Sequence, residues 1–122
     1  MTTYLSAEQI LDAIDLPAED VEVPEWGGTV RVQGLSGTER DKFEARFVND
    51  KGGASPARGL EMFRARMVAA CVVDENGKRL FRSEAEIKRL GEKSASALTR
   101  VVDTARRLSG MTDEDQDELV GN

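Results

Sequence analysis

The sequence contains no histidine and a single cysteine, Cys71, among its 122 residues. Histidine is the commonest general base and a frequent metal ligand near neutral pH, so its absence argues against many catalytic and metal sites. One cysteine can form neither an internal disulfide nor a cysteine-rich zinc site. Cys71 stands on the apolar side of a predicted helix with no histidine to lower its pKa, so we expect it to be a small buried hydrophobic residue.

Long apolar runs are missing as well. No stretch approaches the ~20 apolar residues that cross a bilayer, and the N-terminus has no basic segment followed by an apolar one. Hydrophobic residues still make up 39% of the chain, which is enough for a core in one domain of this length. We expect a soluble cytoplasmic protein that does not enter a membrane.

Basic residues are absent from both ends of the chain. Residues 1–26 carry seven acids and residues 111–122 carry five, whereas residues 27–110 hold all 17 bases and 11 acids, a net charge of +6. We expect one globular domain over 1–110, with the acidic start packed beside the basic centre. Residues 111–122 are expected to form an acidic C-terminal tail.

Two local patterns describe the first third of the chain. Ser6 and Gln9 have the spacing of a capping box, and they predict a helix over about 7–15. Apolar and polar residues alternate over 20–23 and again over 29–33, on either side of a Gly-Gly turn. This alternation predicts a small antiparallel β-hairpin.

Serine caps and helical spacing predict the remaining helices. Ser36, Ser55 and Ser83 stand at helix starts, and the last helix has apolar residues three and four positions apart from Ala95 to Leu108. The sequence therefore predicts an α+β fold, a mainly helical single domain of four to five helices with one small antiparallel hairpin near the N-terminus.

Candidate catalytic and metal motifs fail in their details. Asp74-Glu75-Asn76-Gly77 could begin a calcium loop, but Lys78 and Arg79 replace a ligand and the turn glycine, and Ala85 replaces the bidentate glutamate. An Asn-Gly turn explains these residues better. Gly34-Leu35-Ser36-Gly37 has no Lys-Ser/Thr after it, so it is not a phosphate loop. We expect no metal, no cofactor and no enzymatic activity.

The basic centre raises nucleic-acid binding as a possibility. Its bases alternate with Asp41, Glu44 and Glu61, as on an ordinary solvated helix face, and no nucleic-acid motif is present. Nucleic-acid binding is therefore the less favoured interpretation. The bases in question are Arg40, Lys42, Arg46, Arg58, Arg64 and Arg66.

The order of several short runs resembles a known family. The runs are VPEWGG (23–28), VRV (30–32), LSGTERD (35–41), VDENGKRLF (73–81), LGEKS (90–94) and ARRLSG (105–110). Together they resemble the tail assembly chaperones of bacteriophages with long non-contractile tails. The runs carry no catalytic residues, and the resemblance rests on their order and spacing over roughly residues 20–110.

The resemblance implies a non-enzymatic assembly factor. Such a chaperone would bind the tape-measure protein, and possibly tail-tube subunits, in the host cytoplasm while the tube polymerises, and it would be absent from the mature virion. Holding a long, partly apolar helical client requires exposed apolar side chains. The candidates are Trp26, Phe43, Phe47, Met62 and Phe63.

Two questions stay open at this stage. The rival interpretation is a small nucleic-acid-binding or regulatory phage protein that uses the basic centre. Oppositely charged segments could also pair within one chain or head-to-tail between copies, so a homo-oligomer is possible.

Overall fold

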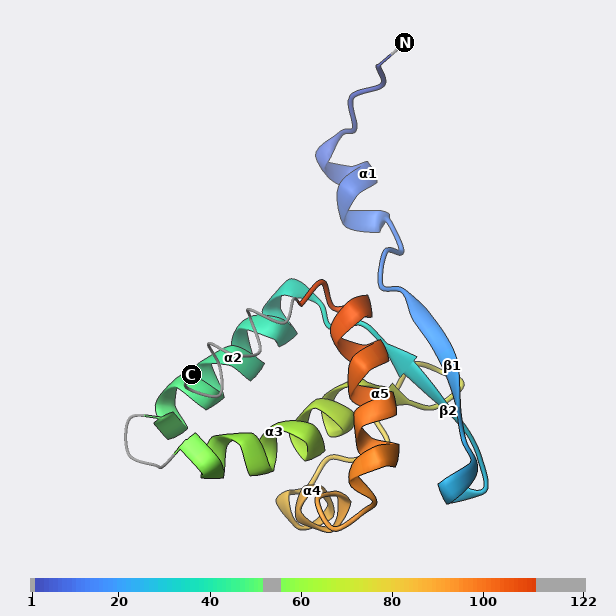
Figure 1. Ribbon diagram of the computed structural model, residues 1–122. Coiled ribbons are helices and arrows are strands. Elements are labelled where there is room, and N and C mark those ends of the chain that lie inside the picture. The colour runs from blue at the N-terminus through green and yellow to red at the C-terminus, as the bar shows by residue number, and fades with distance from the viewer. Residues whose placement is uncertain (1, 52–55, 112–122) are drawn as a thin grey trace.

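The computed structural model describes residues 2–51 and 56–111, and within these ranges the side chains of 47–51 and 56–61 are not described. The described chain forms an α+β single domain with five α-helices and a three-stranded antiparallel sheet (Figure 1). In chain order the elements are α1 (Ala7–Asp12), β1 (Ala18–Val23), η1 (Pro24–Trp26), β2 (Gly28–Gln33), α2 (Gly37–Lys51), α3 (Pro56–Cys71), β3 (Val72–Val73), α4 (Glu84–Leu90) and α5 (Ala95–Leu108).

The predicted hairpin is present as β1 and β2. Its register pairs Ala18 with Gln33 at one end and Val23 with Gly28 at the other. Gly27 joins the strands with φ of 79°, a left-handed conformation that favours glycine. β3 adds a third strand beside β2, in the order β1-β2-β3. This strand was not predicted, because two residues are too few to show an alternating pattern.

The serine caps are confirmed where both partners are described. At the start of α2, the Ser36 hydroxyl accepts the Glu39 N–H at 3.2 Å, and the Glu39 carboxylate accepts the Ser36 N–H at 2.9 Å. Ser83 and Glu86 form the same reciprocal box at the start of α4. Each box satisfies backbone donors that a helix start leaves without partners.

The core lies between α3, α5 and the sheet. Phe63 and Met67 from α3 are fully buried, as is Val32 from β2. The apolar stripe predicted for α5 is buried as well, and Val101 at its centre is fully covered. Packing of α5 onto both α3 and the sheet is what fixes the hairpin relative to the helices (Figure 1).

Two predictions about the first helix are wrong. α1 ends at Asp12 rather than near 15, because Ala13 already has an extended backbone with ψ of 135°, and Pro17 disfavours helix in the residue before it. The helix also does not pack beside the basic centre. None of its residues is buried, and it projects away from the body of the molecule (Figure 1).

Met111, the residue just after the predicted domain of 1–110, packs in the hydrophobic core. It is only 6% exposed. The rest of the predicted acidic tail, 112–122, lies outside the described residues. Within 2–51 and 56–111, no helix combines the length and apolar character required to span a bilayer.

Candidate functional site

A largely apolar groove opens at the hairpin tip, where η1, β2, the chain after β3 and α4 meet. We call it the Trp26 groove, and its volume is about 450 Å³. Its lining residues are Glu25, Trp26, Val30, Val72, Leu80, Phe81, Glu86, Arg89, Leu90 and Lys93.

The walls of the groove are apolar side chains that the core covers only in part. Trp26 lies in the 3₁₀ turn at the hairpin tip, where it is half-buried and packs against the edge of the core. Leu80 on the opposite wall is 47% exposed. Phe81 beside it is half-buried, and Leu90 closes the floor. Partly exposed aromatic and aliphatic groups around a concavity are typical of a site that binds an apolar partner.

The two acids at the rim of the groove accept hydrogen bonds, whereas the two cations at the rim form no ion pair with described residues. Arg100 donates two hydrogen bonds to Glu25, at 2.7 and 3.0 Å, and these hold the pKa of the Glu25 carboxyl below its ordinary value. Glu86 accepts the Arg82 and Ser83 N–H groups, which lower the pKa of its carboxyl. Arg89 and Lys93 form no ion pair with any described residue. The rim therefore offers two available cations.

A second apolar surface lies at the other end of the hairpin. Residues 4–16, here called the N-terminal arm, carry six large apolar side chains that are each at least 38% exposed. Leu11 is 83% exposed and Ile14 is fully exposed. The helix within the arm is nevertheless well formed, since Ser6 and Gln9 complete the predicted capping box. The exposed large apolar residues are Tyr4, Leu5, Ile10, Leu11, Ile14 and Leu16.

The five sequence candidates separate into different environments. Phe43 and Phe63 pack edge to face in the core, with ring centroids 5.6 Å apart. Phe63 is fully buried, whereas Phe43 is 7% exposed and lines a second hollow, described below. Met62 is half-buried on α3, and the Phe47 side chain lies outside the described residues. Of the five, Trp26 is the one placed in the groove.

A second hollow, of about 500 Å³, lies between α2, α3 and the segment that leads into α4. We call it the basic hollow, because six of its lining residues are cations and two are acids. The cations are Lys42, Arg46, Arg66, Lys78, Arg79 and Arg82, and the acids are Glu39 and Glu84.

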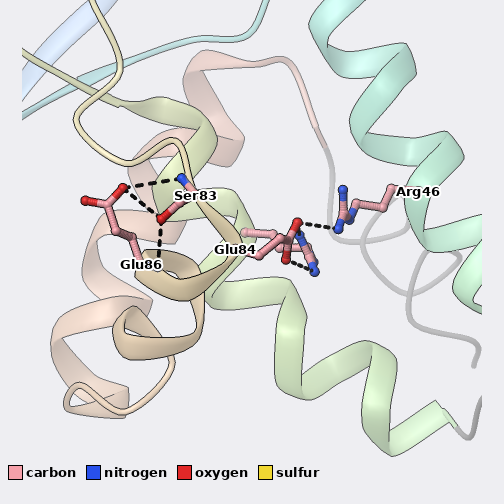
Figure 2. A network of polar contacts seen from close by, with 5 residues as sticks. Arg46, Ser83, Glu84 and Glu86 are labelled. Carbon is pink, nitrogen blue, oxygen red and sulfur yellow. Dashed lines mark hydrogen bonds and ion pairs between the residues drawn. The ribbon is translucent and has the colours of Figure 1, made fainter.

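Glu84 connects three helices at the basic hollow. Its carboxylate accepts from Arg46 on α2 at 2.6 Å (Figure 2) and from Arg66 on α3 at 2.9 and 3.2 Å. The Arg66 hydrogen bonds are the main cause that lowers the pKa of the Glu84 carboxyl. The Arg66 Nε, in contrast, is buried without a hydrogen-bond partner.

The basic patch expected on the second and third helices is only partly this hollow. Lys42, Arg46 and Arg66 line it, whereas Arg40 pairs with Glu44. Arg64 is half-buried and does not line the hollow, and the Arg58 side chain is not described. The cations at 78, 79 and 82 were missed, because a turn after α3 brings them back beside that helix.

The two remaining sequence motifs are structural. Asp74 accepts the N–H groups of Asn76 and Lys78 at 2.8 and 3.0 Å, which is the turn that the sequence predicts. Cys71 is fully buried, as predicted. Burial raises the pKa of its thiol to about 12. Within the described residues, no three His, Cys, Asp or Glu side chains gather as metal ligands would.

Sequence reasoning missed the arm and most of the groove. Ile10, Leu11 and Ile14 form a short apolar stripe in the sequence, and only tertiary structure reveals that all three side chains are exposed. Leu80 and Leu90 lie far from Trp26 in sequence, so no local pattern could group them. The groove combines apolar walls with charged residues at its rim, an arrangement that suits contact with an apolar helix or segment. No protein-family model matches the chain, and neither a curated protein nor a solved structure matches it.

Proposed function

We propose that this protein is a non-enzymatic bacteriophage tail assembly chaperone, which holds the tape-measure protein in the Trp26 groove while the tail tube assembles. The observation that carries the proposal is the groove itself, an apolar concavity of about 450 Å³ with Trp26 and Leu80 on its walls. The resemblance of the sequence to these chaperones supplies the identity of the client.

The dimensions and chemistry of the groove suit a helical client. Amphipathic helices bind by placing apolar residues three or four positions apart into a hydrophobic groove. Tryptophan is among the residues that contribute most binding energy in such contacts. Trp26 and Phe81 offer aromatic surface to the groove, and Leu80 in its lining is 47% exposed.

A chaperone must also release its client, and the groove is suited to moderate affinity. Its walls are partly covered by the protein itself, so the apolar area gained on binding is limited. At roughly 25 cal/mol per Å² of apolar surface, covering one such groove contributes only a few kcal/mol, and the cost of association offsets much of that gain. Tight overall binding of a long client would then come from many copies of the protein bound along its length.

Co-expression tests the function. The tape-measure protein encoded beside this gene should stay soluble and copurify with the wild-type chain, and it should aggregate when expressed alone. If the client is equally soluble and unbound in both cases, the chaperone function is wrong.

A groove variant locates the contact. Leu80→Asp places a charge on the exposed wall of the groove and should release the client. Thr38→Asp adds the same charge at an exposed position on α2 and should leave copurification intact. Equal copurification by both variants would show that the client binds elsewhere.

The basic hollow favours a second candidate function, the binding of nucleic acid or another polyanion. Six cations against two acids surround it, and Lys42, Lys78 and Arg82 form no ion pair with described residues. Its signature would be DNA or RNA affinity that falls steeply with salt, by about 0.9 log units per phosphate contact per decade on duplex DNA. Absence of binding at low ionic strength would eliminate this candidate.

A further inference from the structure

We propose that the N-terminal arm of one copy of this protein docks in the Trp26 groove of a second copy, so that the chain associates head-to-tail. The proposal does not depend on the chaperone function. It rests on two partly exposed surfaces of one molecule that complement each other in apolar character and in charge.

The arm exposes several large apolar side chains to solvent. Leu11 and Ile14 are 83% and 101% exposed, and Tyr4 is 88% exposed. The capping box preorganises α1 before any partner binds, which reduces the conformational entropy lost on docking. Contiguous apolar residues of this kind mark an interaction surface.

The charges of the two surfaces are opposite. The arm and its flanks, residues 2–17, contain three acids and no base, namely Glu8, Asp12 and Asp15. The rim of the groove holds Arg89 and Lys93. Its own acids are already engaged, Glu25 by Arg100 and Glu86 by the α4 cap. An apolar arm that carries three acids would therefore lie beside Arg89 and Lys93 when it docks in the apolar groove.

Geometry favours a second copy over the molecule's own groove. The arm leaves the hairpin at Ala18, the end of the hairpin from which α1 projects (Figure 1). The groove lies at the other end, where Trp26 and residues of α4 line it. Pro17 is held in place because its carbonyl accepts the Gly34 N–H at 2.9 Å. With the start of β1 held there, α1 projects away from the body of its own molecule (Figure 1), which leaves its exposed apolar side chains open to a second copy.

An arm and a groove at opposite ends of one molecule make a heterologous contact. Such contacts repeat from copy to copy and give open chains, or rings where the rotation closes. The mass of the assembly should therefore rise with protein concentration above the 13.4 kDa of one chain.

The decisive experiment mixes two full-length variants that each lack one surface. Leu11→Asp/Ile14→Asp removes the apolar arm, and Leu80→Asp blocks the groove. By light scattering after size-exclusion chromatography, each variant alone should stay at the mass of one chain. Their equimolar mixture should form a species of twice that mass and no larger, because one intact arm meets one intact groove. Thr38→Asp, the matched charge control, should associate like the wild-type chain.

Trp26 provides an internal reporter, since it is the only tryptophan in the chain. Its emission should shift when the wild-type chain assembles, and the arm variant should abolish that shift. Should Leu80→Asp fail to fold by circular dichroism, Arg89→Glu/Lys93→Glu serves as the groove variant instead, with the same expected mass.

Three results would overturn the proposal. The wild-type chain could remain a single copy at all concentrations, the two variants could fail to combine, or each variant could assemble alone. A Trp26 emission change caused by the arm variant without any change in mass would instead show docking within one molecule, and it would overturn the proposal as well.

Discussion

Two arginines of α5 hold the hairpin through paired hydrogen bonds to carboxylates. Arg107 donates to Glu19 at 2.6 and 2.9 Å, and Arg100 donates to Glu25 at 2.7 and 3.0 Å. Bidentate pairs of this kind are stronger and more directional than single contacts. At the scale of single residues, part of the acidic start of the chain is therefore matched by bases from its last helix.

These pairs predict a loss of stability in acid. Hydrogen bonds from Arg107 and Arg100 lower the pKa values of Glu19 and Glu25, so the folded state binds fewer protons than the unfolded state. The stability from these pairs is present above the unfolded pKa near 4.5 and is lost as pH falls through the lower folded values. Urea unfolding followed by circular dichroism from about pH 7 to about pH 3 should reveal the decline.

The matched variants isolate the contribution of the pairs. Arg100→Gln/Arg107→Gln should make the decline below about pH 5 shallower than in the wild-type chain. Arg31→Gln is the control, because exposed Arg31 forms no ion pair with described residues. Equal slopes for all three proteins would contradict a stabilising role for the α5 pairs.

Cys71 should be inert while the protein is folded. It is fully buried, and burial raises the pKa of its thiol to about 12 from an ordinary value of 9.0. A thiol reagent at about pH 8 should therefore react only as fast as the protein unfolds, because the thiolate is the reactive form. Stability should also decline as pH rises from about 9 towards 12, where the unfolded thiol ionises first.

An exposed cysteine supplies the comparison for this measurement. Thr38→Cys places a second thiol at an exposed position on α2, and one thiol per chain should then react rapidly. Rapid reaction of Cys71 in the wild-type chain under native conditions would contradict its burial.

At the scale of elements, the close approach of Gly34 to α5 fixes the hairpin against the helix. A Cβ at Gly34 would lie 2.3 Å from the Leu108 carbonyl oxygen and 2.8 Å from its carbon. Since these are backbone atoms, they cannot rotate away. Gly34→Ala should therefore lower the free energy of unfolding by about 2 kcal/mol, as overpacking typically does.

Gly28, at the start of β2, provides the matched control for Gly34, which directly follows that strand. A Cβ there would meet nothing within 4 Å, so Gly28→Ala should change stability by no more than about 0.5 kcal/mol. Thermal and urea unfolding of both variants measure the difference. Equal stability of the two variants would show that α5 does not pack against the end of β2 in this way.

Elements with a strong local signal could be predicted from sequence, and contacts between elements could not. The Ser36–Glu39 and Ser83–Glu86 boxes fix helix starts within four residues of chain, and the α5 stripe repeats at helical spacing. β3 is too short to show a pattern. The apolar spacing of α1 resembles a core-facing helix, yet whether such a stripe meets a partner depends on the whole fold.

The same limit applies to the candidate site, where residues with a local signal could be predicted and residues that the fold brings together could not. Trp26 could be suspected from sequence, because a lone tryptophan beside two glycines stands at a turn. Phe43 and Phe63 offered equally large apolar side chains, but the core uses both. Leu80, Arg89 and Lys93 reach the groove only because the chain reverses after β3 and places α4 beside the hairpin tip.

At the scale of the whole molecule, the segregated charge has two roles. Glu19 of β1 and Glu25 of η1 pair with α5, while the acids of the arm form no ion pair with a described base. Arm and client would also use one groove, so client binding should release the arm of the neighbouring copy. A chain of copies held by arms would thereby exchange contacts with each other for contacts with a long client.

The most direct test of the central claim, the proposed chaperone function, is the affinity of the chain for soluble helical segments of a tape-measure protein, the proposed client. Calorimetry should give binding to the wild-type chain and to Thr38→Asp with equal affinity. Leu80→Asp should weaken binding at least about tenfold, because it places a charge on an apolar contact surface. Unchanged affinity for Leu80→Asp, or no binding to the wild-type chain, would contradict a client-holding groove at Trp26.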